Sequence, residues 1–200
     1  MTTWIEEPSG GRDRGPRAVL RAWVEVLNRP GRFFRAGVAP GDQAPGLSFA
    51  MLVVLVEETT RLALDPTAIP AITGTSALSG LLVVAVATLV VTPAALHLVA
   101  AIQTLALMAL ADDRAGISET VQVLAYASAP CVFAGIPIPG IRVVATAYGA
   151  YLLFVGLGVV HDLRGWRLGL AGVVPATLVF GYGFRGFAAL AEQLARWYII

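Results

Sequence analysis

The sequence predicts an all-α integral membrane protein: a bundle of five transmembrane helices with an N-terminal amphipathic interfacial helix. From Pro66 to Ala111 the chain has no Asp, Glu, Lys or Arg, a stretch about twice the ~20 apolar residues that one spanning helix needs. Hydrophobic residues make up 57% of the chain and charged residues 14%, whereas soluble domains have roughly half and a quarter. Both observations indicate prolonged contact with lipid.

Residues 1–45 are predicted to form a cytoplasmic tail with an amphipathic helix near residues 16–28. Apolar residues recur there at helical spacing while arginines take the other side. The apolar set is Val19, Leu20, Trp23, Val24 and Leu27. Two placements remain open: the helix lies in the lipid headgroup region, or it packs on the protein's own cytoplasmic surface.

Four aromatic residues are predicted to anchor the protein at the membrane interface: Trp23, Phe33, Phe34 and Trp166. Tryptophan is enriched at the headgroup level. Phe33 and Phe34 are flanked by Arg32 and Arg35, whose guanidinium groups would meet lipid phosphates.

A membrane domain over residues 46–190 is predicted from five apolar blocks, and residues 191–200 form a C-terminal tail. The blocks are Leu47–Leu64, Ala77–Ala111, Thr120–Ile136, Val143–Val160 and Leu168–Leu190. The second block would extend about 50 Å as one helix. A hairpin broken at Thr92–Pro93 would leave two short arms without a polar loop, so we expect one long, tilted helix kinked at the proline.

The positions of the arginines predict orientation. Seven precede the first block, at positions 12, 14, 17, 21, 29, 32 and 35. Five spans with a cytoplasmic N-terminus place Arg114, Arg164 and Arg167 inside as well, in accord with the positive-inside rule. We therefore expect a multi-pass protein of the cell membrane with its C-terminus outside.

Ionisable residues inside the spans are predicted to cluster at one depth in the outer half of the membrane. The set is Glu57, Glu58, Arg61, Arg142 and Arg185. Glu57 and Arg61 have the i,i+4 spacing of a helical ion pair. Charges within a span need partners, so the cluster is either a structural clamp or a site for a substrate or ion.

Three isolated polar residues, His97, Gln103 and Tyr126, lie within apolar blocks. We expect hydrogen bonds between helices from Gln103 and Tyr126. His97 is expected to bond a neighbouring helix or the carbonyl freed by Pro93. With His161 at a different depth, no metal site is predicted, and Cys131 is expected to be a small buried apolar residue.

No nucleotide-binding, metalloprotease or serine-hydrolase motif is present, and a net charge of +1 gives no indication of nucleic-acid binding. We expect no cofactor and no enzymatic activity. One alternative is a CaaX-type intramembrane protease, whose Glu-Glu-Arg motif resembles Glu57-Glu58-Thr-Thr-Arg61. The motif here is one residue short, and the family's Phe four residues before a His is Pro93.

The chain resembles the Yip family, five-span membrane proteins named for interaction with Ypt/Rab GTPases. The resemblance covers roughly residues 23–187. It rests on the order of Arg29-Pro30, Phe33-Phe34, Ala125-Tyr126-Ala-Ser-Ala-Pro130 and Ile136-Pro-Ile-Pro-Gly140. The Asp-Leu-Tyr-Gly-Pro motif of eukaryotic members is absent from residues 1–45, so the chain is similar to the prokaryotic branch. The resemblance implies fold and membrane location, and carries over no catalytic residue.

The leading hypothesis is a non-enzymatic membrane organiser or scaffold that binds lipid, or a membrane or cytoplasmic protein partner, through residues 16–35. The alternative is a small transporter or channel subunit that uses Glu57 and Glu58. A water-accessible cavity that reaches either carboxylate would favour transport, whereas a dry, paired cluster would favour the scaffold. The sequence does not predict the oligomeric state.

Overall fold

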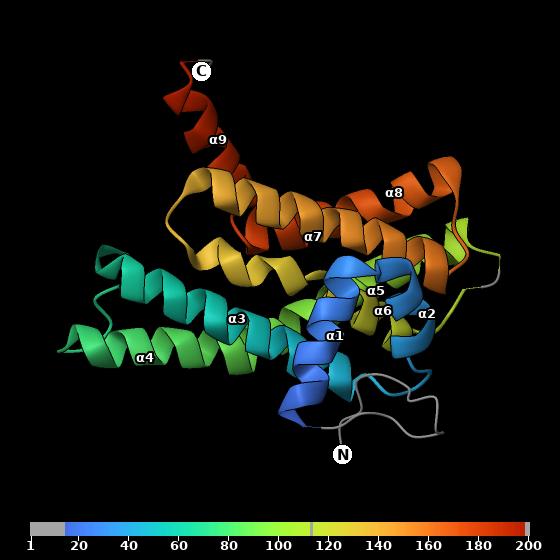
Figure 1. The fold of residues 1–200 in the computed structure, drawn as a ribbon, viewed down its shortest axis with the longest axis horizontal. Helices are drawn as coiled ribbons and strands as arrows, with labels where there is room; N and C mark the ends of the chain where they lie inside the picture. Colours follow the sequence, from blue (N-terminus) through green and yellow to red (C-terminus); the bar gives the residue numbers. More distant parts are fainter. Residues whose placement is uncertain (1–14, 113, 199–200) are drawn as a thin grey trace.

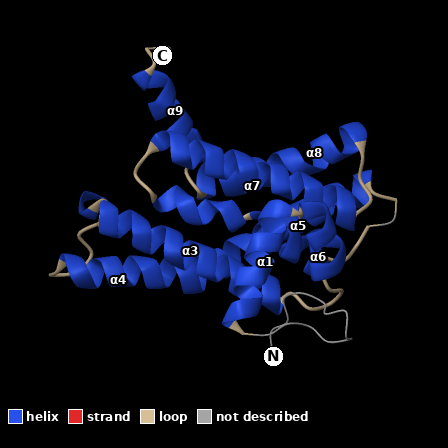
Figure 2. Ribbon diagram, viewed as in Figure 1, coloured by secondary structure: helices blue, strands red, loops and turns tan. Residues whose placement is uncertain are grey.

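The computed structural model describes residues 15–112 and 114–198. Within these two stretches every regular element is helical (Figures 1 and 2). The α-helices are α1 (Pro16–Asn28), α2 (Pro30–Gly37), α3 (Ala44–Leu64), α4 (Ser76–Val86), α5 (Thr92–Leu110), α6 (Ile117–Ala127), α7 (Pro139–Val160), α8 (Gly165–Ala176) and α9 (Gly186–Arg196). The 3₁₀ segments are η1 (Pro66–Ala68) and η3 (Ala129–Gly135), and the π-helical segments are η2 (Ala87–Val91) and η4 (Thr177–Gly183).

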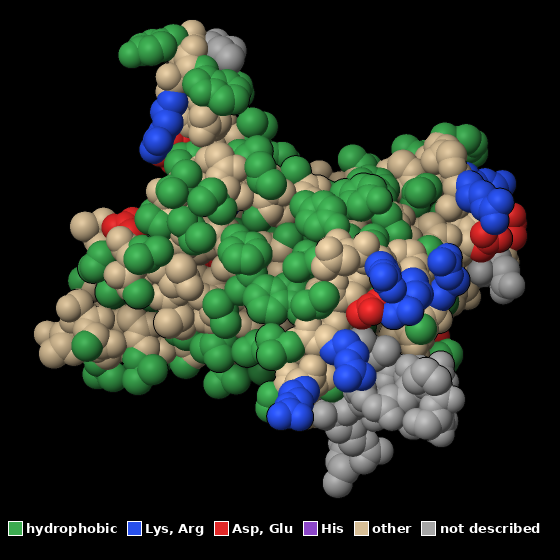
Figure 3. All heavy atoms as spheres, in the orientation of Figure 1, with side chains coloured by type: hydrophobic (Ala, Val, Ile, Leu, Met, Phe, Trp, Pro, Cys, Tyr) green, Lys and Arg blue, Asp and Glu red, His purple; other side chains and the backbone are tan. Residues whose placement is uncertain are grey.

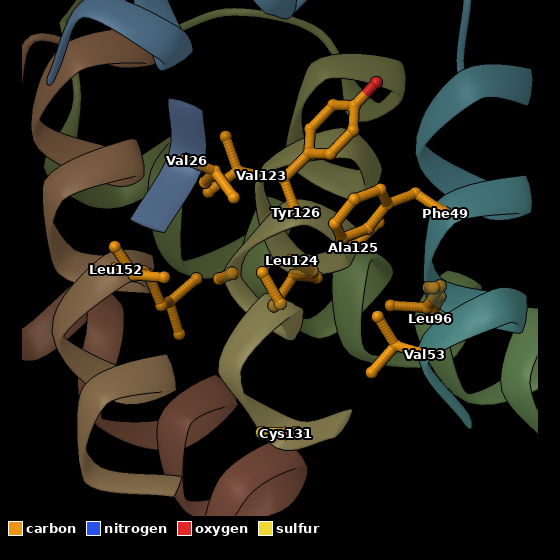
Figure 4. Close-up of a cluster of buried hydrophobic side chains, with 14 of the residues drawn as sticks. Val26, Phe49, Val53, Leu96, Val123, Leu124, Ala125, Tyr126, Cys131 and Leu152 are labelled. Atoms are coloured by element: carbon orange, nitrogen blue, oxygen red, sulfur yellow. The ribbon is translucent and has the colours of Figure 1, made fainter. Parts of the chain in front are cut away.

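The centre of the molecule is α6 with its continuation η3. Every residue from Thr120 to Val132 is buried, and α3, α5 and α7 pack around this segment. Figure 4 shows Leu124 and Tyr126 of α6 among apolar side chains of several other helices. Cys131 belongs to this core and is 0% exposed. The third block is therefore the central, enclosed segment of the bundle.

The second apolar block forms one helical run, Ser76–Leu110, of 35 residues. It has no hairpin at Thr92–Pro93. Instead, the π-helical η2 precedes Pro93, and the Thr92 hydroxyl donates to the Ala87 carbonyl at 2.7 Å. A wider helical turn next to a proline compensates for the backbone hydrogen bond that the proline cannot donate.

Among the described residues, two helices are long and apolar enough to cross a membrane, Ser76–Leu110 and Pro139–Val160. A third span is possible if Gly165–Gly183 and Gly186–Arg196, which meet at a bend of 67°, count as one. The first block carries three charges, and the third changes from α to 3₁₀ helix at Ser128. The five-span count therefore stays a prediction.

The fifth block, predicted as one span over Leu168–Leu190, is not one continuous helix. It bends at Phe184–Arg185, and α9 turns away from the bundle and continues to Arg196 (Figure 1). The tail predicted over residues 191–200 thus begins inside α9. Likewise, α3 begins at Ala44, so the predicted boundary at residue 45 lies inside that helix.

Helix α1 lies across the bundle and packs on the protein itself, in contact with α6 and η3 (Figure 1). Its buried face is Ala18, Ala22 and Val26, each at most 2% exposed. Of the predicted apolar residues, Leu20 and Val24 are 58% and 60% exposed, whereas Val19, Trp23 and Leu27 are partly buried against the core. An interfacial role for α1 remains a prediction.

The assignment of Phe33 and Phe34 as interfacial anchors is wrong. They are 2% and 1% exposed, and the rings of Phe33 and Tyr126 pack edge to face with 4.8 Å between their centroids. The aromatic rings of α2 fill the core next to α6, whereas their neighbours Arg32 and Arg35 stay exposed.

Trp23 is half-buried, and its role as an interfacial anchor stays a prediction. Its indole N–H donates to the Ala129 carbonyl at 2.9 Å, and its ring stacks on Phe133. Trp166 is 68% exposed, and its role as an anchor stays a prediction.

Candidate functional site

Two carboxylates and two arginines form a buried ionic cluster between α3 and the turn before α9. Arg61 donates to Glu58 Oε2 from two nitrogens, at 2.9 and 2.6 Å. Arg185 donates to Glu58 Oε1 at 3.0 Å and also to Glu57 Oε1. Glu57 and Glu58 are 2% and 7% exposed, so both charges depend on these partners.

The pairing differs from the i,i+4 ion pair expected between Glu57 and Arg61. Arg61 bonds Glu58 instead, at i,i+3, because Glu57 points toward Arg185. Arg142 makes no ion pair with a described residue, and its Nε donates to the Ala134 carbonyl at 2.8 Å. The structure thus joins four of the five expected residues directly and sets Arg142 against the backbone of η3.

Two backbone features hold the cluster in place. Gly135 of η3 lies so close to α3 that a Cβ atom there would be 2.2 Å from the Glu57 carbonyl oxygen. Arg185 has a left-handed backbone, with φ of 59°, which is uncommon for a residue with a side chain. It occupies the 67° bend, and its ion pairs with α3 offset this strain.

A cavity of about 190 Å³ adjoins the two carboxylates, and we call it the lateral cavity. It lies between α3, η2, α5, α6 and η4. Its polar wall residues are Glu57, Glu58, Thr92 and Ser128, and its apolar wall includes Ala50, Val54, Ala95, Leu96, Val99, Leu124, Leu178 and Phe184. Both π-helical segments contribute to the wall, and such segments are frequent at functional sites.

His97 does not line the lateral cavity. Its side chain is on the surface of α5, and its Nδ1 bonds the carbonyl of Pro93 itself at 2.7 Å. The expectation of a bond to a neighbouring helix is therefore wrong, because the partner carbonyl lies four residues earlier on the same helix. Protease chemistry needs His97 next to Glu58, and this arrangement does not provide it.

Two other predicted polar residues join helices. Gln103 of α5 donates from Nε2 to the Ala171 carbonyl of α8 at 2.9 Å. Tyr126 is fully buried, with its ring against Phe33 and Phe49. These contacts fix helices relative to one another and leave no room for a ligand.

Exposed arginines gather along one edge of the molecule. Figure 3 shows arginine side chains over α1, α2 and the turn from α7 to α8, with a broad hydrophobic surface beside them. The exposed arginines of α1 and α2 and the turn between them are Arg17, Arg21, Arg29, Arg32 and Arg35, and we call this set the basic edge. Of these, Arg32 pairs with Glu25 at 2.6 Å.

His161, which follows α7, is a buried titratable group that sequence reasoning left without a partner. It is 2% exposed, with Nε2 3.4 Å from the Thr120 hydroxyl. Burial, together with the positive charge of Arg114, lowers the pKa of His161 to about 4. The contact joins residues 41 positions apart, and no local pattern in the sequence indicates it.

The described residues contain no group of three or more His, Cys, Asp or Glu side chains that could hold a metal ion.

The family model of the Yip1 domain matches residues 24–185 of this chain. No curated protein and no solved structure matches the chain. The matched range contains most of the helical bundle, the ionic cluster and the lateral cavity.

Proposed function

Because the chain belongs to the Yip1 domain family and has long apolar helices, we propose that this membrane protein is a non-enzymatic organiser. In this proposal it gathers anionic lipids, and protein partners with them, at the cytoplasmic face of the cell membrane. In this proposal the N-terminus lies inside and the C-terminus outside, in accord with the positive-inside rule.

The basic edge is the observation that carries the proposal. Five exposed arginines lie on α1 and α2 and between them, and the exposed Leu20 and Val24 lie on the same helix as two of them. Cationic side chains beside apolar ones suit a surface at the headgroup level. Each arginine near an anionic membrane surface contributes about 1 kcal/mol of attraction.

The ionic cluster supports a structural role for the charges within the bundle. Glu58 has both oxygens bonded to arginines, and Glu57 has one. Carboxylates held in this way are poor bases for activating water, which favours an organiser over a hydrolase.

The experiment compares full-length protein with the variant R17Q/R29Q/R35Q in nanodiscs that mix phosphatidylglycerol and phosphatidylcholine. The measurement is the enrichment of spin-labelled phosphatidylglycerol around the protein. We expect the variant to lose most of its preference, by up to about 3 kcal/mol at low salt. High salt should reduce the preference of the parent protein in the same way.

The matched control is R114Q/R164Q/R167Q, which removes three exposed arginines outside residues 16–35. It should retain most of the preference, because Arg164 and Arg167 already pair with Asp162 and Asp112. If both variants behave alike, the basic edge has no special role, and the proposal fails.

A second candidate, a small transporter or channel subunit, is favoured by the lateral cavity, because this cavity reaches Glu57 and Glu58. It predicts ion or proton flux across proteoliposomes that the substitution Glu57→Gln abolishes. Flux that is absent from the parent protein, or equal in both proteins, would remove this candidate.

A further inference from the structure

We infer that Arg142 and Arg185 bind a phosphate group at the end of the bundle opposite to the basic edge. The start of α7 and the whole of α9 lie at the left of Figure 1, whereas α2 and the turn from α7 to α8 lie at the right. The inference goes beyond the proposed function, because it concerns a second place for anions, at the other end of the spanning helices.

Backbone contacts hold Arg142 next to the ionic cluster. Its Nε donates to the Ala134 carbonyl at 2.8 Å. The next residue, Gly135, packs directly on the backbone of Glu57, since a Cβ atom there would overlap the Glu57 carbonyl. The guanidinium group of Arg142 is thus anchored to the part of η3 that touches the carboxylates of α3.

A second contact brings the bend before α9 to the same place. A Cβ atom on Gly186 would be 2.8 Å from the Thr146 hydroxyl oxygen. This hydroxyl donates to the Arg142 carbonyl at 2.8 Å, one helical turn earlier on α7. Because Gly186 directly follows Arg185, the bend packs on the first turns of α7, and the two arginines belong to one neighbourhood.

This neighbourhood has more positive than negative charge. Within the ionic cluster, Arg61 and Arg185 balance Glu57 and Glu58, and Arg142 adds a third guanidinium group against two carboxylates. Of the charged side chains around Arg142, Arg185 acts on it most strongly. Like charges at close range in a poorly hydrated place repel each other, and charges in a span need partners.

The other carboxylate near Arg142 is already occupied. Glu192 of α9 also acts on Arg142, but its Oε1 accepts from Arg196 at 2.8 Å. A bound anion would therefore supply the negative charge that the described residues do not provide.

The arginines also have hydrogen-bond donors in excess. Arg185 donates from both terminal nitrogens to Glu57 and Glu58, but its Nε is buried and has no partner among the described residues. Arg142 is partly exposed. Only its Nε bonds a described residue, so its two terminal NH₂ groups are the donors that a ligand meets from the surface. The ligand that suits this place is an acceptor and an anion.

The depth of Arg142 favours phosphate. Helix α7 is apolar enough to cross a membrane, and its 22 residues extend about 33 Å, close to the ~30 Å of the hydrocarbon core. Arg142 is in the first turns of α7 and thus lies near the headgroups, where lipid phosphates are. Arginine binds phosphate through two parallel N–H bonds. A lipid headgroup or a free phosphate ion could supply this group.

The experiment measures hydrogen exchange of the full-length protein in an uncharged maltoside detergent. The three additives are dihexanoyl phosphatidylglycerol, inorganic phosphate, and dihexanoylglycerol, which has the same chains without phosphate. We expect the phospholipid to slow exchange in residues 139–146 and 184–189, and dihexanoylglycerol not to. Slower exchange with inorganic phosphate as well would assign the site to any phosphate, and slower exchange with the phospholipid alone to a headgroup. No effect of either phosphate, or an equal effect of dihexanoylglycerol, would overturn the inference.

A charge-matched pair of variants tests the role of Arg142. R142Q should raise the phosphate or phospholipid concentration needed for half of the protection about tenfold or more, because a hydrogen bond to a charged group is lost. R142K keeps the charge but not the paired N–H groups and should fall between. R164Q removes one exposed arginine at the other end and should behave like the parent. Equal concentrations for R142Q and the parent would contradict the inference, and the comparison of additives needs no variant.

The variant R17Q/R29Q/R35Q separates this site from the basic edge. It should keep the protection of residues 139–146, because the substituted arginines lie on α1 and α2 and between them. Protection that disappears in this variant would show that the phosphate acts through the basic edge, and would overturn the inference without affecting the proposed function.

Discussion

Glu58 is the residue that joins the two arginines of the buried ionic cluster. One oxygen accepts from Arg61 of its own helix and the other from Arg185 at the distant bend. The free energy of such a cluster depends on complete pairing, because an arginine left without its carboxylate remains in a poorly hydrated site.

The substitution Glu58→Gln should destabilise the protein by about 3 kcal/mol, the lower end of the usual loss when a buried pair is broken. Thermal unfolding in detergent measures this change. The control is E192Q, since Glu192 and Arg196 form a pair that is 53% and 58% exposed, for which about 0–1 kcal/mol is expected. Equal unfolding temperatures for E58Q and the parent protein would show that the cluster is not a clamp.

Gly135 keeps η3 against α3 beside Glu57. In Gly135→Ala the new methyl group would overlap the Glu57 carbonyl, with a separation of 2.2 Å before any shift. Backbone cannot move aside as a side chain does, so we expect a large loss of folded protein in detergent extracts. Gly169→Ala, where no atom lies within 4 Å of the new Cβ, should be tolerated, and similar yields for both variants would contradict this account.

His161 should make stability depend on pH. Its pKa is lowered from 6.5 to about 4, so between these values the unfolded chain binds a proton that the folded chain excludes. As the pH falls from 6.5 toward 4, protonation of His161 in the unfolded chain lowers the free energy of unfolding. The total decrease is about 3 kcal/mol. Carboxylates also titrate in this range, so the measurement is the difference in the free energy of unfolding between the parent protein and H161Q from pH 7 to pH 4. Parallel curves would contradict the prediction.

At the scale of single elements, several helices were predictable and their partners were not. The apolar run from Ala77 to Ala111 favours one helix because no polar loop interrupts it, and the structure has that helix. Phe33 and Phe34 look interfacial because arginines flank them. Phe33 is buried against Tyr126, which is far away in the sequence, and Phe34 packs against Phe33. The glycines at 181, 183 and 186 are a local signal for the bend at Arg185, but its ion pairs with the carboxylates of α3 are not predictable from nearby residues.

Helix α1 is held to the bundle by small side chains, and enlarging one should detach it. In A22F a phenylalanine replaces a residue that is 0% exposed, and overpacking of this kind costs roughly 1–3 kcal/mol. We expect faster amide hydrogen exchange across residues 16–28 and unchanged exchange in α6. V24F, at a position 60% exposed, should exchange like the parent protein. Equal protection in both variants would mean that α1 does not depend on this face.

For the molecule as a whole, composition alone predicts membrane insertion. The resemblance to the Yip family is confirmed by the match of the Yip1 domain to residues 24–185. The number of crossings is harder to predict. Helix α3 carries the charges of the ionic cluster, and α6 with η3 is enclosed by other helices rather than by lipid. Hydropathy indicates that a segment is excluded from water. It does not distinguish burial in a protein interior from burial in a bilayer.

The central claim is that the chain crosses the bilayer an odd number of times and has its basic edge inside. Because Cys131 is the only cysteine, a C131S background allows one new cysteine at Thr3 or Tyr198 to be labelled with a membrane-impermeant maleimide. We predict that Y198C reacts in intact cells and that T3C reacts only after permeabilisation. If both positions react from the same side, the number of crossings is even and the five-span topology is wrong. If T3C reacts in intact cells, the basic edge is not cytoplasmic.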